Sequence, residues 1–355
     1  MEIRGFTYQG MPNRIIFGVG ALDQLAAMVA ELGGKRAMVL STPQQAADAD
    51  HVSALLGALS AGVFCKATMH TPIEVTTQAV AAMREVGADC TVAFGGGSTT
   101  GLGKAIAYRL NTHQIAIPTT YAGSEVTPIL GQTEKGEKTT VRHASILPGT
   151  VIYDPLLTMD LPYAMSVTSG LNAMAHAAEA LYAKDRNPIS TLMAIEGLRA
   201  FAKALPALQQ DPRDPDARQS ALYGAWLCGT VLGAVGMSLH HKLCHVLGGT
   251  FELPHAETHA VILPHAVHFN EAEAAVALAP ARALFGRQTA GIGLYEFAKN
   301  LGAPTSLRAI GMAEHDLVRA ADIASHNAYW NPRPVDQEQI FKMLHAAWRG
   351  DQPGA

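Results

Sequence analysis

Residues 90–110, CTVAFGGGSTTGLGKAIAYRL, decide the fold of the first half of this chain. A short apolar run leads into three glycines and a serine, and a helical pattern follows. Residues without side chains let backbone N–H groups approach an anion, and the start of a helix adds the positive end of its dipole. The segment therefore predicts a pyrophosphate site at Gly95, Gly96, Gly97 and Ser98. The alternative is an ordinary strand-to-helix turn, because neither a Walker loop nor a GxGxxG string is present.

The same alternation of helix and strand extends to both sides of this segment. After a predicted hairpin at 6–18, helical patterns alternate with extended ones, at 20–32, 36–41, 51–60, 62–68, 76–87 and 114–120. Such alternation predicts an α/β domain with a parallel sheet covered by helices on both faces. The string IPTTYAGSE, residues 117–125, again ends a strand with small hydroxyl residues. It predicts a second wall of the same cofactor site, formed by Thr119, Thr120 and Ser124.

The pattern changes at about residue 155. From there to the end, long segments rich in Ala, Leu and Met are separated by short Pro or Gly breaks, with no clear strand. We therefore expect a dinucleotide-binding domain at 1–155 and an all-helical substrate and catalytic domain at 156–355. Ligands are expected to bind in a cleft between two such domains.

The composition excludes several classes of protein. The chain has 355 residues, of which 48% are hydrophobic and 16% charged, with a net charge of −4 and no basic run, which argues against nucleic-acid binding. No apolar stretch approaches the roughly 18 to 20 residues of a membrane span. The start, MEIRGFTYQG, lacks the apolar block of a signal peptide. The four cysteines have no CxxC spacing, which predicts reduced thiols in the cytoplasm.

Histidines are concentrated in SLHHKLCHVLGGTFELPH, residues 238–255, which contains four of them. Imidazoles at this density usually bind a transition metal or act as acids and bases. Passive packing within a helix is the third possibility. The residues alone leave these three interpretations open.

Several strings together resemble the iron-dependent alcohol dehydrogenase superfamily, nearly from end to end. They are FGGGSTTGLGKAIA, IPTTYAGSEVTPIL, SGLNAMAHAAEA, the histidine segment and the late NPRP. Within that superfamily, GGGSTTGLGK, TTYAGSE and LPHAETHAVILPHA are most similar to the maleylacetate reductases. The resemblance implies a homodimer that uses NADH or NADPH to reduce the C=C bond of maleylacetate, a small dicarboxylate, in the bacterial breakdown of aromatic compounds. It also implies that Gly95 to Ser98 hold the pyrophosphate, that Thr119 and Thr120 face the nicotinamide half, and that Lys138 contacts the cofactor.

Two positions depart from the resembled pattern near the dinucleotide. Metal-dependent members usually carry an aspartate where this chain has Gly101, so one polar anchor is absent. Ser41, Thr42 and Pro43 follow the strand at 36–41, where an acidic side chain would bind the ribose hydroxyls and repel a 2′-phosphate. We therefore expect weak discrimination between NADH and NADPH.

A further departure concerns the metal. The resemblance places the metal-binding aspartate and three histidines at Asn172, His176, His241 and His255, so only the aspartate is missing. A neutral amide and three neutral imidazoles leave a divalent charge uncompensated, and the ammonium of Lys242 beside His241 would oppose it further. We therefore expect no metal.

The reaction implied by the resemblance needs a hydrogen-bond donor for an enolate oxygen, a proton source and partners for two carboxylates. Histidinium suits the first two tasks, so His241 and His255 are the candidate polarising donor and proton source, supported by His245. Lys242 and Arg142 are candidates for binding carboxylates. Weaker candidates are His143 and His259, and His265 is interpreted as a cap of a helix or turn.

Three other functions stay open at this point. The first is a metal-dependent alcohol dehydrogenase in which Asn172 serves as a ligand. The second is a dinucleotide-binding protein without catalytic activity. The third is a lyase similar to dehydroquinate synthase, which would need a complete metal site.

Overall fold

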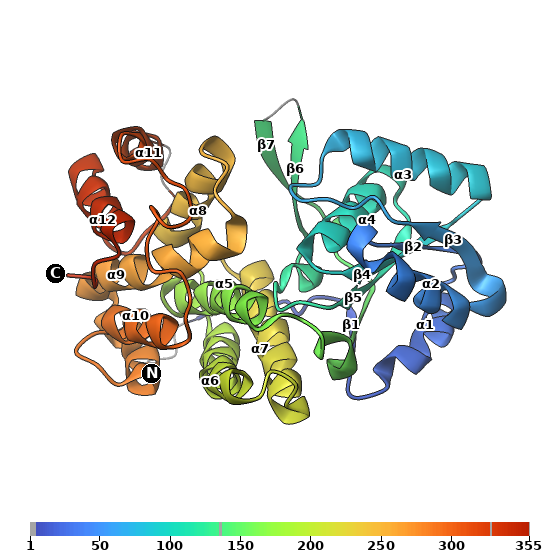
Figure 1. Cartoon of the computed structure of the whole chain (residues 1–355), viewed down its shortest axis with the longest axis horizontal. Coiled ribbons are helices and arrows are strands. Elements are labelled where there is room, and N and C mark those ends of the chain that lie inside the picture. The colour runs from blue at the N-terminus through green and yellow to red at the C-terminus, as the bar shows by residue number, and fades with distance from the viewer. Residues whose placement is uncertain (1–4, 135–136, 327–328, 355) are drawn as a thin grey trace. The chain divides into compact units, whose positions relative to one another are not determined.

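The computed structural model describes residues 5–134, 137–326 and 329–354. They form two compact units, and Figure 1 shows the elements of each. The first unit spans residues 10–161, and the second contains residues 162–354 together with residues 5–9. The division at Leu161 and Pro162 falls a few residues beyond the domain boundary expected at 155.

The first unit is built on a six-stranded parallel sheet with the order β1-β8-β5-β4-β2-β3. Its strands are β1 Arg14–Phe17, β2 Ala37–Leu40, β3 Ser60–Phe64, β4 Cys90–Gly95, β5 His113–Pro118 and β8 Thr150–Tyr153. Its helices are α1 Leu25–Glu31, α2 Ala46–Leu55, α3 Ile73–Val86 and α4 Gly97–Leu110. Short 3-10 turns lie at Ala21–Gln24, Pro43–Gln45, Gly57–Leu59, Ser124–Val126, Ala144–Ile146 and Pro155–Thr158.

Both faces of this sheet are covered. Successive side chains of β2 point to opposite faces, because a strand has a period of two residues. Val39 packs into a core with residues of α1 and α2, whereas Met38 and Leu40 pack into another core with residues of α3 and α4. All four residues of β2 are buried. The predicted parallel sheet with helices on both faces is confirmed.

Two hairpins differ from the sequence expectation. The hairpin predicted at 6–18 is wrong, because β1 pairs in parallel with β8 instead of with the residues just before it. A hairpin that was not predicted is formed by β6 Ile129–Glu134 and β7 Glu137–Arg142, which pair antiparallel. It lies between β5 and β8 in the chain order.

The second unit is helical, as predicted, and no strand occurs among its described residues. Its helices are α5 Tyr163–Tyr182, α6 Pro188–Gln210, α7 Pro215–Ala234, α8 Leu239–Thr250, α9 His255–Phe285, α10 Ala290–Asn300, α11 Asp316–Ser325 and α12 Gln337–Arg349. Side-chain caps fix several starts: Asn187 accepts backbone N–H groups of α6, Asp214 those of α7 and Thr289 one of α10. Among the described helices, no single one has both the length and the apolar character of a membrane span.

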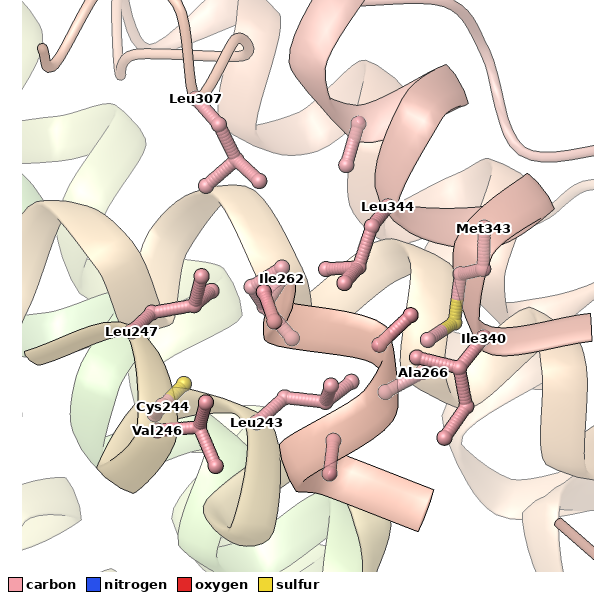
Figure 2. Close-up of a cluster of buried hydrophobic side chains, with 14 of the residues drawn as sticks. Leu243, Cys244, Val246, Leu247, Ile262, Ala266, Leu307, Ile340, Met343 and Leu344 are labelled. Atoms are coloured by element: carbon pink, nitrogen blue, oxygen red, sulfur yellow. The ribbon is translucent and has the colours of Figure 1, made fainter. Parts of the chain in front are cut away.

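One face of α8 is anchored in an apolar core of the helical unit. Leu243 and Leu247 of α8 pack there with Ile262 of α9 and with Ile340 and Leu344 of α12 (Figure 2). All five side chains are fully buried. This packing fixes the positions of α8 and α9, which carry most of the histidines of the candidate site.

Candidate functional site

The turn after β4 is shaped by two glycines that have no room for side chains. Gly95 has a φ of +145°, and a Cβ there would lie 2.6 Å from Thr99 Oγ1. A Cβ on Gly96 would lie 3.0 Å from Thr120 Cγ2. α4 begins at Gly97, and the first N–H groups of a helix have no partners within the helix itself. The turn therefore has the backbone geometry of an anion site.

The other predicted cofactor residues follow strands that neighbour β4 in the sheet. Thr42 follows β2, and Thr119 follows β5. The backbone N–H of Thr119 donates to Gly95 O at 3.1 Å. Gln45 Nε2 also donates to Thr119 Oγ1 at 3.2 Å. The structure thus brings these residues together at the carboxyl edge of one sheet. Ser41 differs from these residues because its side chain is buried, and its hydroxyl donates to Thr42 O at 3.0 Å. Thr42 is therefore the more accessible of the two.

Gly101, the position without the expected aspartate, packs against Thr71. A Cβ on Gly101 would lie 2.4 Å from Thr71 Oγ1. Thr71 has a φ of +47°, an uncommon conformation for a β-branched residue, and it is buried. A side chain at position 101 would therefore displace Thr71.

A buried polar network holds the segment after β5, and the sequence did not predict it. Lys104 of α4 donates from Nζ to Thr127 Oγ1 and to Ile129 O, both at 2.9 Å, and also to Ser124 O. Burial lowers the pKa of Lys104 to about 7. The neighbouring Glu125 accepts a hydrogen bond from Tyr153 Oη at 2.7 Å, and burial raises the pKa of its carboxyl group. Ser124 thus belongs to a segment that is tied firmly to α4.

Three further site residues predicted in the first unit are not brought together with the residues of the glycine turn by any described contact. The side chain of Lys138 lies outside the described part of the structure. Arg142 is exposed at the end of β7, in a different compact unit from the histidine segment. His143 is also exposed, and its Nδ1 lies 2.8 Å from Ser145 Oγ at the start of a 3-10 turn, which is a local capping contact.

In the helical unit, α5, α8 and α9 bring three imidazoles together. His176, His241 and His259 each offer a nitrogen within 4.8 Å of the nitrogens of the other two, and all three side chains are buried. Asn172 lies one helical turn before His176 on α5 and is 4% exposed. In the described part of the chain, His241 Nε2 and His176 Nδ1 have no hydrogen-bond partner. These nitrogens are available to a ligand, an ion or a proton.

Glu179, a residue that the sequence reasoning missed, organises this cluster. Its Oε2 lies 2.7 Å from His241 Nδ1 and accepts the backbone N–H of Ser238 at 2.8 Å. Its Oε1 accepts the backbone N–H of His240, also at 2.8 Å. A carboxylate at the start of α8 is favoured by the helix dipole. Because Nδ1 of His241 donates to the carboxylate, Nε2 becomes the nitrogen that can bind or deliver a proton.

A second group of side chains adjoins the first through His259. His240 Nε2 lies 2.9 Å from His259 Nδ1 and 3.6 Å from Cys244 Sγ. Burial, and then the neighbouring imidazoles, hold the pKa of His176, His240 and His259 well below the usual value. These three rings are therefore neutral at neutral pH. The two residues expected to act as histidinium, His241 and His255, are not among these three.

The remaining histidine candidates lie around the cluster. His255 is the exposed first residue of α9, and its ring centroid is 4.4 Å from that of His259. His245 Nδ1 lies 3.0 Å from Tyr329 Oη, and Lys242 Nζ lies 5.9 Å from the centroid of the same Tyr329 ring. His259, a weaker candidate in the sequence, thus joins His176 and His241 in the place expected for His255.

The interpretation of His265 as a cap is wrong. It lies inside α9, ten residues after the start of the helix, and is 3% exposed. A signal for Glu179 was present in the sequence, because it is the only charged residue in α5 and follows His176 by three positions, on the same helical face. His240 carried no such signal, since its partner lies on another helix.

The chain matches known proteins over nearly its whole length. Residues 12–155 match the iron-containing alcohol dehydrogenase family, and residues 166–348 match its C-terminal part. A maleylacetate reductase of Rhizobium sp. (strain MTP-10005) is 60% identical over 98% of this chain and 99% of that protein. The crystal structure of a maleylacetate reductase from Agrobacterium tumefaciens has a TM-score of 0.96 at 60% identity, and the match covers 99% of this chain and 100% of the other. An iron-containing alcohol dehydrogenase from Corynebacterium glutamicum has a TM-score of 0.94 at 39% identity and is covered to 99%, as is this chain.

Proposed function

The chain belongs to the iron-containing alcohol dehydrogenase family, and we propose that it reduces the carbon–carbon double bond of maleylacetate, 4-oxohex-2-enedioate, to give 3-oxoadipate. It is a dinucleotide-dependent oxidoreductase. The full-length similarity to maleylacetate reductases supports this substrate. NADH and NADPH are both proposed as reductants, because no acidic side chain follows β2 to exclude a 2′-phosphate.

The substrate determines what the protein must supply. A bound reduced nicotinamide provides a hydride for the double-bond carbon that is β to the ketone. Negative charge then develops on the ketone oxygen as an enolate, and the α carbon takes up a proton. The protein must therefore stabilise an oxyanion, deliver one proton and bind two carboxylates.

The observation that carries the proposal is the 2.7 Å contact between His241 Nδ1 and Glu179 Oε2. A carboxylate fixes the orientation of the imidazole and stabilises its charged form. His241 can therefore hold a proton on Nε2, donate it as a hydrogen bond to the developing oxyanion, and transfer it to carbon. His176 and His259 lie beside it as neutral rings that exclude water from this nitrogen.

Carboxylate binding is proposed for Lys242 and Arg142. Lys242 is half-buried next to His241, and its ammonium nitrogen lies 5.9 Å from the centroid of the Tyr329 ring. Arg142 offers a bidentate guanidinium at the end of β7. His245, which also contacts Tyr329, is proposed to support this arrangement.

The family name implies a metal, and the buried imidazoles are ligands of a suitable type. The charge of the surrounding side chains, however, does not suit a divalent ion. Position 172 holds a neutral amide, and the carboxylate of Glu179 is already engaged by His241 and two backbone N–H groups. A divalent ion among neutral ligands would lose attractions worth about 4 kcal/mol per charge pair at contact, for an effective dielectric constant of about 20. We therefore propose that turnover needs no metal.

A second candidate function has one observation in its favour. The nitrogens of His176, His241 and His259 lie within 4.8 Å of one another, a spacing that a single metal ion can bridge. A metal there would favour alcohol oxidation, in which a Lewis acid lowers the pKa of the alcohol.

One assay separates the two functions. Oxidation of NADH and NADPH is followed with freshly generated maleylacetate, with EDTA present throughout, and the metal content of the same enzyme is measured. The proposed function expects full turnover without stoichiometric metal. Chelator-sensitive turnover of an alcohol or aldehyde, with maleylacetate left unreduced, contradicts it.

A further inference from the structure

We propose that His240, Cys244 and His259 form a binding site for a thiophilic divalent cation such as Zn²⁺. One ligand atom of each residue lies within 4.8 Å of the other two, and all three side chains are buried. None of the three occupies a position that the family resemblance assigns to its metal. The site shares His259 with the cluster of His176, His241 and His259, and it differs from that cluster by taking a sulfur ligand from Cys244.

The arrangement of the ligands fits tetrahedral coordination with little movement. His240 and Cys244 are four residues apart on α8, so both side chains project from one helical face. Tetrahedral Zn–N and Zn–S bonds of about 2.0 and 2.3 Å place nitrogen and sulfur about 3.6 Å apart. The distance from His240 Nε2 to Cys244 Sγ is 3.6 Å. Two nitrogens on the same ion lie about 3.3 Å apart, so His240 and His259 would have to separate slightly from their present 2.9 Å.

The contacts of His240 also favour a cation at this point. His240 Nε2 now contacts both His259 Nδ1 and Cys244 Sγ, and an ion would take the place of the shared protons. Binding therefore releases the thiol proton of Cys244, as metal binding by cysteine generally does.

Charge distinguishes this site from the three-imidazole cluster next to it. A thiolate ligand reduces the charge of a divalent ion by one. The compensation that is missing at Asn172 is thus present at Cys244.

Cys244 differs from another buried thiol, Cys228 of α7. Burial raises the pKa of Cys228, and its Sγ packs closely against Gly197. Cys244 lies on the helix that faces the apolar core, as Figure 2 shows, yet its sulfur contacts a histidine nitrogen. Cys228 is therefore the matched control for a buried cysteine without a histidine partner of this kind.

Cobalt(II) is a spectroscopic probe for this site. The metal-stripped full-length protein is titrated with Co²⁺, and absorption is recorded in the near ultraviolet and the visible. We expect a thiolate-to-cobalt charge-transfer band that saturates at one ion per chain, is lost in Cys244→Ser and is retained in Cys228→Ser. A spectrum without the charge-transfer band, or a band that persists in Cys244→Ser, overturns the proposal.

A second measurement needs no variant. X-ray absorption of the zinc-loaded wild-type protein should show one sulfur at about 2.3 Å among the ligands. A shell of nitrogen and oxygen alone would assign the ion to the other histidines and overturn the proposal. Neither experiment depends on the reduction of maleylacetate, so the outcome is independent of the proposed function.

Discussion

The glycine turn of the first unit and the histidine cluster of the second are built by opposite means. Gly95, Gly96 and the start of α4 are consecutive in the chain, and the strand order alone places Thr119 beside them. The cluster instead takes one histidine from each of α5, α8 and α9, which span residues 163–285. A local turn depends mainly on backbone freedom, whereas a convergent cluster depends on side-chain packing and charge. Substitutions in the two regions should therefore affect different properties: dinucleotide binding for the glycine turn, and turnover for the histidine cluster.

The largest effect is expected in the cluster, for His241→Ala. Loss of an acid or base group typically lowers turnover by about 100-fold or more. We expect kcat to fall by this factor while the dissociation constant for NADH, measured by fluorescence, stays the same. His315→Ala, at an exposed histidine, is the control. Near-wild-type kcat in His241→Ala would remove this residue from the mechanism.

Glu179→Gln should have the next largest effect. The glutamine keeps the size of the side chain. Its NH₂ group, however, would face at least one of the three N–H groups that the carboxylate now accepts, from His241, Ser238 and His240. Loss of a partner that orients a functional histidine typically costs about 10- to 100-fold in activity. We expect this loss in kcat, with KM for the dinucleotide unchanged.

The nitrogen-15 shifts of His241 test whether Glu179 acts through the imidazole. In the wild type Nδ1 should carry a proton, and in Glu179→Gln the proton should shift towards Nε2. A variant that loses activity with an unchanged His241 spectrum would show that Glu179 has a structural role only.

The contrast between the two regions also explains which parts could be predicted. The glycine turn and the covered sheet follow from hydrophobic pattern and chain order, and both were predicted. Asn172 and His176 were found by resemblance, and their spacing on one helix then placed them together. His240 and His259 meet across two helices, and no local pattern encodes that contact. Glu179 was overlooked although a lone charge in an alanine-rich helix indicates a buried partner.

The hairpins show the same limit within the fold. The residues of β1 have an extended pattern, but their partner β8 lies far along the chain. The pattern of a strand does not show whether it pairs with a neighbouring or a distant segment. The hairpin of β6 and β7 was not predicted because both strands are largely polar and lack the regular apolar alternation that marks a strand.

In the glycine turn, Gly95→Ala should weaken dinucleotide binding by about 10-fold, because overpacking costs roughly 1 to 3 kcal/mol. The new Cβ would lie 2.6 Å from Thr99 Oγ1, at a φ that L residues rarely adopt. Gly249→Ala is the matched control, since this residue lies outside the turn and its Cβ would meet nothing within 4 Å. Calorimetry with NADH measures both variants, and equal weakening by the two would contradict this explanation of the turn.

The smallest effect is expected for the pH dependence of stability, at His265. The imidazole of His241 contacts a carboxylate, whereas His265 tests the effect of burial on an imidazole. Burial lowers the pKa of His265 to about 4, against an opposing attraction from Asp351. Between the folded value and the ordinary value of 6.5, the unfolded chain binds more protons, so stability is full above about pH 6.5 and is lost as the pH falls towards 4. From about pH 7 to 5.5 this loss amounts to roughly 1 kcal/mol.

Urea unfolding of the wild type and of His265→Leu at these two pH values measures the difference. The variant should lose about 1 kcal/mol less than the wild type on acidification, whatever its stability at pH 7. His315→Leu, at an exposed position, should lose as much as the wild type. Parallel losses in His265→Leu and the wild type would mean that His265 stays protonated when buried, and burial alone would then not explain why the rings around His241 are neutral.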